Sequence, residues 1–308
     1  MPFSTPPPLS RVSADEMRAS LFHLAKDPLP FRKLNLTLPG HEKSTLHEAD
    51  DFIASKLEGW GYLVQREAVP VQAYRCDASK PIMHQYSAPA PEDPWYTAYN
   101  LYARKIGTEL PEEIVVVISH KDSQSWCDSP GANDNCIGSV GNMEVARVLA
   151  DVPTRRSVWF IWCNEEHSPW TSATAAQNAR ERGDNIVAVF NLDGLGVKAP
   201  EVTATGVKTC VVAFSEPEGE ALADLVGAAN AAHGLGLEFS KAQREHPNDD
   251  DGSFVKAGYP AACIVIGSWP YGDPNYHQAG DVPELTDVEN AALAVQAVVG
   301  AMLAKDAM

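Results

Sequence analysis

Apolar runs that end in polar residues most strongly constrain how this 308-residue chain can fold. Four nearly continuous runs, each five or six residues long, cover residues 113–118, 157–162, 186–190 and 261–266. Such runs are typical of central strands buried on both faces of a sheet. Segments with helical spacing of apolar residues cover 138–149, 171–182, 217–233 and 287–303. The alternation predicts an α/β fold, a mostly parallel central sheet with helices on both faces.

The N-terminal part of the chain is less regular. Residues 1–13 are rich in Pro and Ser, and we expect a flexible segment there. The elements expected next are helices over 14–25 and 46–57, a strand over 62–71 and an irregular surface loop over 77–95. Because the alternation continues and no internal repeat is found, we expect one catalytic domain over residues 14–308.

Composition narrows the classes of function. The chain is 44% hydrophobic with a mean hydropathy of -0.22, and no apolar run approaches the roughly 20 residues that span a membrane, so we expect no membrane partner. A net charge of -17 and a pI near 4.9 argue against nucleic acid as a partner. The six cysteines lack CxxC spacing and are expected as free thiols. The first residues lack the pattern of a secretory signal, so a cytoplasmic location is expected.

Five polar islands follow or interrupt the apolar runs, and together they carry His, Asp, Glu and Asn. They cover residues 119–122, 131–135, 164–166, 191–194 and 276–277. In an open α/β sheet, binding sites form outside the carboxyl ends of the strands. We therefore expect these islands to meet at one edge of the sheet.

The islands contain the donors of a site for two divalent metal ions, which we expect to be zinc. Zinc favours imidazole and carboxylate donors, and a pair of ions needs a shared carboxylate with further ligands for each ion. The expected ligands are His120, Asp134 as the bridge, one residue of the pair Glu165 and Glu166, Asp193 and His277. Adjacent carboxylates in an extended segment point to opposite sides, which suits one ligand and one general base. Asp122 would orient the His120 ring.

These islands resemble, in order and spacing, the co-catalytic zinc aminopeptidases of metallopeptidase family twenty-eight, relatives of glutamate carboxypeptidase and glutaminyl cyclase. The resemblance covers roughly residues 15–304, and includes Arg32, residues 100–103 and residues 249–254. It implies the zinc-peptidase architecture, with a phosphorylase/hydrolase-like fold, and removal of N-terminal residues from peptides. A peptide or small amide is the expected substrate.

The resemblance also implies a role for each matching residue. His120 and Asp193 would bind one ion, Glu166 and His277 the other, and Asp134 would bridge them. The remaining catalytic roles would be Glu165 as general base and Tyr276 as a donor to the oxyanion.

Two departures from the family pattern concern the substrate pocket. Residues 167–170, His-Ser-Pro-Trp, follow the Glu pair where the family usually has small residues, and Asp251 stands where histidine is usual. We interpret His167 as a polar residue of the loop rather than a substrate contact. Cys136, two positions after the bridge, is interpreted as a small buried residue. Candidates for the rim of the pocket are Trp95, Trp269 and Tyr271.

Other activities remain open at this point. A carboxypeptidase or a hydrolase of small N-acyl amides would use the same chemistry and would need an Arg as carboxylate anchor; the candidates are Arg155, Arg156 and Arg244. A glutaminyl-cyclase-like acyltransferase would use one zinc ion, which the complete donor set disfavours. A binding module without catalysis would be expected to have lost ligands.

Overall fold

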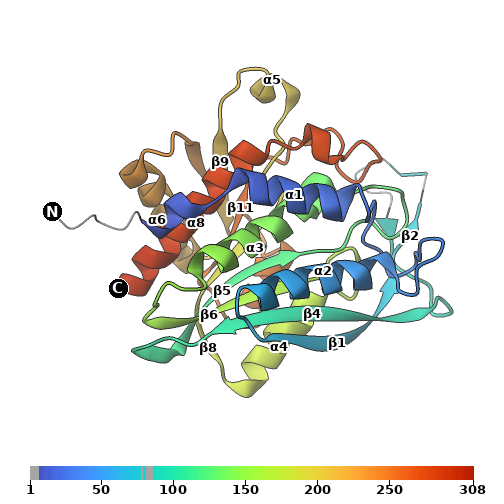
Figure 1. Ribbon diagram of the computed structural model, residues 1–308, viewed down its shortest axis with the longest axis horizontal. Helices are drawn as coiled ribbons and strands as arrows, with labels where there is room; N and C mark the ends of the chain where they lie inside the picture. Colours follow the sequence, from blue (N-terminus) through green and yellow to red (C-terminus); the bar gives the residue numbers. More distant parts are fainter. Residues whose placement is uncertain (1–6, 78, 81–85) are drawn as a thin grey trace.

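The structure is a computed structural model that describes residues 7–77, 79–80 and 86–308. Its centre is a mixed sheet of nine described strands in the order β10-β9-β11-β8-β5-β6-β4-β1-β7 (Figure 1). The strands are β1 Val64–Ala73, β4 Trp95–Lys105, β5 Leu110–His120, β6 Arg156–Cys163, β7 His167–Ser168, β8 Asn185–Leu192, β9 Thr209–Phe214, β10 Glu238–Gln243 and β11 Ala262–Ile266. A separate short hairpin pairs β2, Arg75–Cys76, with β3, Tyr86–Ser87.

The strands at the centre run parallel, as predicted. Strand β5 pairs parallel with both β6 and β8, and β8 pairs parallel with β11. Toward the flanks, β4 pairs antiparallel with β6 and β1, and β11 pairs antiparallel with β9, whereas the edge strand β10 pairs parallel with β9. The predicted α/β class with helices on both faces is confirmed.

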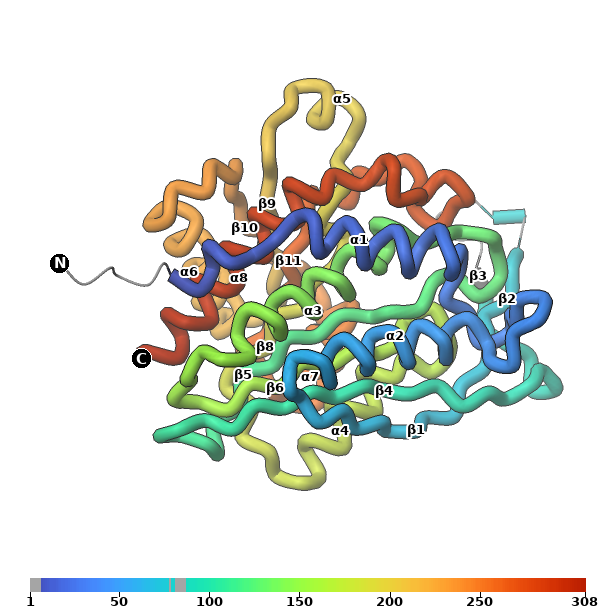
Figure 2. The backbone as a smooth tube through the Cα atoms, in the orientation of Figure 1, coloured from blue at the N-terminus to red at the C-terminus, as the bar shows by residue number. Residues whose placement is uncertain are grey.

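Two layers of helices cover the sheet. The helices are α1 Ala14–Ala25, α2 Thr45–Gly59, α3 Ile137–Leu149, α4 Thr171–Arg182, α5 Pro200–Thr203, α6 Pro217–His233, α7 Asp249–Lys256 and α8 Val288–Ala307. Residues of α1, α2, α3, α6 and α8 share one core cluster, and residues of α4 and α7 share another. Figure 1 shows α1, α2 and α3 on one side of the sheet. In Figure 2 the segment around α5, which connects β8 to β9 in the chain, projects from the body of the protein.

Alternation along each central strand divides its side chains between these two layers. In β5, Val115 and Val117 join the first cluster, whereas Val116 and Ile118 join the second. This is the period-two geometry of a strand buried on both faces, and it explains the continuous apolar run. Burial of both faces places the polar residues at the strand ends, where the chain leaves the core.

The helix bounds agree closely with the helical spacing in the sequence, because the ends carry capping residues. Ser13 accepts a hydrogen bond from the backbone N–H of Glu16 at the start of α1, and Asp287 caps α8 in the same way. Helices α4 and α6 end at Gly183 and Gly234, both with left-handed φ. Strands β4, β9 and β10 were not predicted from apolar runs.

Two expectations need correction. Within the segment expected to be flexible, Pro8–Arg11 forms a 3-10 helix whose Leu9 is buried in the main core; residues 1–6 lie outside the described residues. Helix α8 is long and apolar enough, by length and composition, to cross a membrane. However, 67% of its apolar window is buried inside the fold, as in the core helix of a globular protein. All six cysteines are free, as expected.

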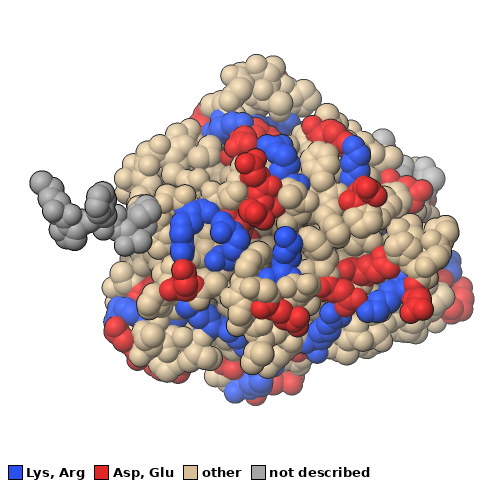
Figure 3. All heavy atoms as spheres, viewed as in Figure 1, with Lys and Arg blue, Asp and Glu red and all other residues tan. Residues whose placement is uncertain are grey.

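Figure 3 shows acidic and basic side chains interspersed on the face that carries α1 and α2. Exposed charges of the protein form ion pairs, for example Arg18 with Glu289 at 2.9 Å and Arg66 with Asp51 at 2.8 Å. Exposed pairs of this kind contribute only about 0–1 kcal/mol each. The stability of the fold therefore depends mainly on the two apolar clusters.

Candidate metal centre and active site

The register of the parallel strands brings the polar islands together. His120, the last residue of β5, is paired with Cys163 at the end of β6, and Ile118 is paired with Asn191 near the end of β8. The chain therefore leaves these three strands at the same edge of the sheet. The residues that follow them, Glu165, Glu166 and Asp193, emerge side by side with His120.

Two triads of donors share Asp134. His120 Nε2 lies 3.2 Å from Asp134 Oδ1 and 3.5 Å from Asp193 Oδ2. His277 Nε2 lies 2.9 Å from Asp134 Oδ2 and 3.3 Å from Glu166 Oε1. Within each triad the donor atoms all lie within 4.8 Å of one another. The two oxygens of Asp134 thus face different imidazoles, which is the arrangement expected of a bridging carboxylate.

The charge of this cluster fits divalent metal ions. None of the five side chains is more than 13% exposed. Burial raises the pKa of Asp193 to about 7 and also raises the pKa of Glu166. Buried carboxylates resist ionisation unless cations compensate them. Since zinc prefers imidazole nitrogen and carboxylate oxygen, the two triads are consistent with a co-catalytic zinc pair.

The same carboxylates raise the pKa values of the two imidazoles. Burial alone would lower the pKa of His277, but the charges of Glu166 and Asp134 outweigh it and raise the pKa to about 10. Burial is likewise outweighed at His120, whose pKa is raised well above its usual range by Asp122, Asp134 and Asp193. Metal ions and protons therefore compete for the same ring nitrogens.

Asp122 holds the His120 ring and the Glu pair at once. Its Oδ1 lies 3.3 Å from His120 Nδ1 and accepts a 2.9 Å bond from the Glu165 backbone N–H. Its Oδ2 accepts a 2.8 Å bond from the Glu166 backbone N–H and lies 2.7 Å from His167 Nδ1. Asp122 is fully buried, so it acts on the site through His120 and the backbone of the two glutamates. His167 is also fully buried, but it lies in the short strand β7, paired with β1, rather than in a loop as predicted.

Two further residues that position the site, Lys121 and Asp281, were not predicted from the sequence. Lys121 is fully buried, and its Nζ contacts Asp50 at 3.1 Å, Asn164 Oδ1 at 2.7 Å and the Tyr99 carbonyl at 2.9 Å. Asp281 accepts bonds from the backbone N–H groups of residues 133 and 134, at 2.7 and 3.0 Å. The sequence did offer a signal for Lys121, a Lys at the end of an apolar run and next to His120, because Lys in a buried segment almost always has a partner. Asp281 carried no such signal.

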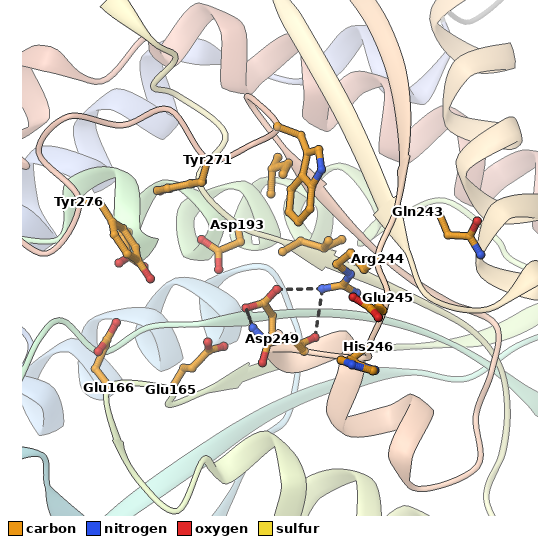
Figure 4. Close-up of a pocket in the computed structure, with 15 residues that line it drawn as sticks. Glu165, Glu166, Asp193, Gln243, Arg244, Glu245, His246, Asp249, Tyr271 and Tyr276 are labelled. Carbon is orange, nitrogen blue, oxygen red and sulfur yellow. Dashed lines mark hydrogen bonds and ion pairs between the residues drawn. The ribbon is translucent and has the colours of Figure 1, made fainter. Parts of the chain in front are cut away.

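A cavity of about 410 Å³ lies beside the triads. Its lining residues are Asp134, Glu165, Glu166, Asp193, Gln243, Arg244, Glu245, His246, Asn248, Asp249, Ile264, Ile266, Trp269, Tyr271 and Tyr276. Figure 4 shows Glu165, Glu166 and Tyr276 on one side of it and Arg244, Glu245 and His246 on the other. A smaller groove of about 30 Å³ shares Glu165, Glu166 and Tyr276, and is completed by Tyr74, Trp170 and His277.

Glu165 and Tyr276 occupy the boundary between cavity and groove. Burial, together with the charges of Asp250 and Asp249, raises the pKa of Glu165 well above its usual range. The Tyr276 ring stacks on the His277 ring with a centroid distance of 3.7 Å and contacts the Tyr271 ring edge-on. Both predicted catalytic side chains therefore lie beside the triads and line a cavity.

The remaining candidates divide clearly. Trp269 and Tyr271 line the cavity, and so does Arg244, whereas Trp95 is absent from both cavity linings described above. Arg155 and Arg156 lie at the amino end of β6, bonded to Asp306, and so belong to the opposite edge of the sheet. Cys136 is buried in the main core, as expected.

Comparison with known proteins agrees with this site. The structure combines an α/β fold with two donor triads that form a candidate site for two metal ions. Residues 100–302 match the family model described as Peptidase family M28. The chain belongs to this family, a family of zinc metallopeptidases and aminopeptidases.

One relative is a protein of Saccharomyces cerevisiae named "Probable aminopeptidase", 23% identical over 218 residues, which are 67% of this chain and 56% of the yeast protein. The match thus spans just over half of that relative. An aminopeptidase from Aneurinibacillus sp. strain AM-1 has a TM-score of 0.68 at 16% identity, covering 96% of this chain and 94% of that one. Glutaminyl cyclase of Bacteroides thetaiotaomicron has a TM-score of 0.71 at 16% identity, covering 95% and 98%. At these identities the two structures show the shared fold.

Proposed function

We propose that the protein is a two-zinc aminopeptidase that removes N-terminal residues from peptides. The observation that carries the proposal is the pair of buried triads sharing Asp134, which open into the 410 Å³ cavity with Glu165 at its boundary. Because the large cavity and the small groove meet at Glu165, a peptide that bridges them would present its scissile bond to the metal site. The yeast relative, named as an aminopeptidase, supports the same activity.

Zinc ions bound by His120, Asp193, Glu166, His277 and the bridging Asp134 would activate a water molecule and polarise the scissile carbonyl. Glu165 would accept the proton of the attacking water and pass it to the nitrogen of the leaving amine. Burial raises the pKa of Glu165 above its usual range, and a higher pKa makes its carboxylate a stronger base toward the attacking water.

Asp122 and Tyr276 would support this proton transfer from two sides. Asp122 holds the backbone of Glu165 and Glu166, so it orients the base and the adjacent ligand together. Burial raises the pKa of Tyr276 well above its usual range, so its phenol keeps the proton that a donor to the oxyanion needs. Stacking on His277 restricts the ring and fixes the direction of that donor.

The position of Arg244 favours an aminopeptidase over a carboxypeptidase. A carboxypeptidase needs a cation in the cavity to bind the substrate's terminal carboxylate. Arg244 is the Arg that lines the cavity, but it already pairs with Asp249 at 2.8 Å and with Asp251. Its charge is therefore compensated within the protein.

Hydrolysis of a matched peptide panel, with N-termini either free or acetylated, tests the proposal. We expect cleavage of the free-amine peptides only, loss of cleavage with a chelator, and recovery on zinc addition. Cleavage of only the acetylated peptides would contradict the proposal and favour a carboxypeptidase or N-acyl amide hydrolase. Conversion of N-terminal glutamine to a cyclic product, with one bound zinc ion, would favour acyl transfer as in glutaminyl cyclase.

The two glutamates provide a matched pair of variants. Glu165→Gln should keep both zinc ions and lose turnover by a factor of about 10² or more, as expected for removal of a general base. Glu166→Gln should lose zinc from one of the two positions. Zinc content measured by mass spectrometry separates the two roles, and unchanged turnover in Glu165→Gln would rule out its role as base.

A further inference from the structure

The side chain of Glu166 is held on one side by a buried glutamine. Gln124 is only 2% exposed, and its Nε2 donates a hydrogen bond to Glu166 Oε2. The other oxygen of the same carboxylate, Oε1, lies 3.3 Å from His277 Nε2. The two oxygens of Glu166 therefore differ in their surroundings, because one is bound to an amide and the other faces an imidazole of the metal triad.

The neighbours of Gln124 in the chain fix its position. Ser123 exchanges two hydrogen bonds with Arg32, one from the Ser123 backbone N–H to the Arg32 carbonyl and one from the Arg32 backbone N–H to Ser123 Oγ, each at 3.0 Å. On the other side, Asn35 Nδ2 donates to the Ser125 carbonyl at 2.8 Å. Because both neighbours are bound to other parts of the fold, the Gln124 side chain has little freedom to move.

The orientation of the Gln124 amide follows from the charge of its partner. A carboxylate oxygen accepts hydrogen bonds, so the NH₂ group of Gln124 faces Glu166 and the amide oxygen faces away. In this orientation Gln124 Oε1 is buried without a donor among the residues that the structure describes. An unpaired buried acceptor is unfavourable, and an apolar side chain that only filled the space would avoid it. The bond to Glu166 therefore accounts for a polar residue at this position.

The other two carboxylates of the triads are not held by an amide. Asp134 presents its two oxygens to two different imidazoles, so both oxygens are available to metal ions. Asp193 Oδ2 lies 3.5 Å from His120 Nε2, and within the described part of the chain no amide side chain donates to either oxygen of Asp193. Glu166 thus differs from both, because one of its oxygens is already occupied.

We propose that Gln124 restricts Glu166 to binding its metal ion through one oxygen, Oε1. A carboxylate that is free on both sides can bind an ion through two oxygens and so occupy two coordination positions. With Oε2 held by Gln124, the ion bound by Glu166, His277 and Asp134 keeps a position open for water or substrate. The proposal rests on the two-metal site of the function proposed above. Gln124 is a positioning residue in it, since it acts on the ion through Glu166.

Gln124→Met tests the proposal, because methionine is unbranched and of similar size but has no amide. Stepwise zinc titration against a chelating dye gives one constant for each ion, and His277→Ala identifies the constant that belongs to the Glu166 position. In Gln124→Met we expect that constant to weaken about 10–100-fold, because Glu166 is no longer held in one orientation. The constant of the His120 position should stay unchanged.

The cobalt-substituted protein reports the coordination number without turnover. Co²⁺ absorbs visible light more strongly when it has few ligands than when its coordination sphere is full. In Gln124→Met the Glu166 carboxylate is free to bind through both oxygens, so we expect the visible absorption per bound cobalt to fall. Absorption equal to that of the wild type would overturn the restriction to one oxygen, whether or not zinc binding had weakened.

Gln72→Met is the matched control. Gln72 is also buried, at 7% exposure, but its Nε2 donates to the carbonyl groups of Ala90 and Asp93, at 3.2 and 2.8 Å, rather than to a metal ligand. The control should lose stability and keep both zinc constants. Equal changes of zinc binding in the two variants would show a general effect on the fold and would overturn the proposal.

Failure of the proposed function would give a different result. If the wild type bound two zinc ions but cleaved no free-amine peptide, the aminopeptidase assignment would fail, and the metal measurements would still decide the role of Gln124. If the wild type cleaved such peptides and Gln124→Met kept both zinc constants and the cobalt absorption, only the role of Gln124 would fail.

Discussion

Replacement of Asp122 by Asn tests how much of the metal site depends on one buried carboxylate. Asp122 accepts bonds from the backbone N–H groups of Glu165 and Glu166 at 2.9 and 2.8 Å, and lies within 3.3 Å of one ring nitrogen in His120 and in His167. An Asn side chain has the same shape but only one acceptor oxygen. Whichever way it is oriented, its NH₂ group faces the N–H of one of the two glutamates.

The structure sets the size of the effect. Hydrogen bonds to a charged group contribute about 1.5–3 kcal/mol each, and Asn retains those on one side only. Since each oxygen has two such contacts, we expect the free energy of unfolding to fall by about 3–6 kcal/mol. Loss of a residue that orients metal ligands typically weakens metal affinity about 10–100-fold. That factor corresponds to about 1.4–2.7 kcal/mol of zinc binding free energy.

Zinc titration in competition with a chelating dye measures the affinity, and urea unfolding measures the stability. Asp306→Asn is the matched control, because Asp306 also accepts two backbone N–H bonds, at 2.9 and 2.7 Å, at the opposite end of β6. The control should lose stability and keep its zinc affinity. Equal zinc affinities in Asp122→Asn and the control would refute the role of Asp122 in positioning ligands.

Two further predictions concern pH and packing. The raised pKa of His277, about 10, keeps its ring protonated at neutral pH in the metal-free protein. Zinc binding should therefore release protons, and the zinc affinity should increase as the pH rises from 6 to 9. A zinc affinity that stays constant over this range in calorimetry would contradict this prediction. For the same reason the metal-free protein should lose stability as the pH rises from about 6.5 to 10, a trend that His277→Ala should weaken. Phe160→Ala, at a fully buried position in β6, should cost about 3–5 kcal/mol in urea unfolding. Ile106→Ala, at a position 71% exposed, should change stability by less than about 0.5 kcal/mol, and similar losses in both would argue against this packing.

The parts of the fold that could be predicted are those with a strong local pattern. Strands β5, β6, β8 and β11 are buried on both faces over most of their length, so each contains a nearly continuous apolar run, and α4 and α6 end at glycines. Strand β10 could not be predicted in this way, because it is an edge strand with no buried residue. Its place depends on pairing with β9, which no local pattern encodes.

The metal triads were predictable for a different reason. Parallel strands must end at a common edge, so residues that follow β5, β6 and β8 meet even though they are far apart in the chain. The role of Asp251 could not be predicted, because it depends on Arg244, which reaches it from the end of β10. Runs of three aspartates are usually solvated, and only the fold shows that Asp251 is buried against a guanidinium.

The distribution of charge around the site favours the binding of metal ions at its centre. Each buried cation nearby already has its partners: Arg32 donates to the carbonyls of residues 24, 121, 130 and 131, and Lys121 to Asp50, Asn164 and a carbonyl. Arg244 is taken up by the aspartates of α7. Among the described residues, the ion pairs of Asp134, Glu166 and Asp193 come from imidazoles alone. Because two imidazoles cannot balance three buried carboxylates even when both rings are protonated, the fold concentrates negative charge where divalent cations bind most favourably.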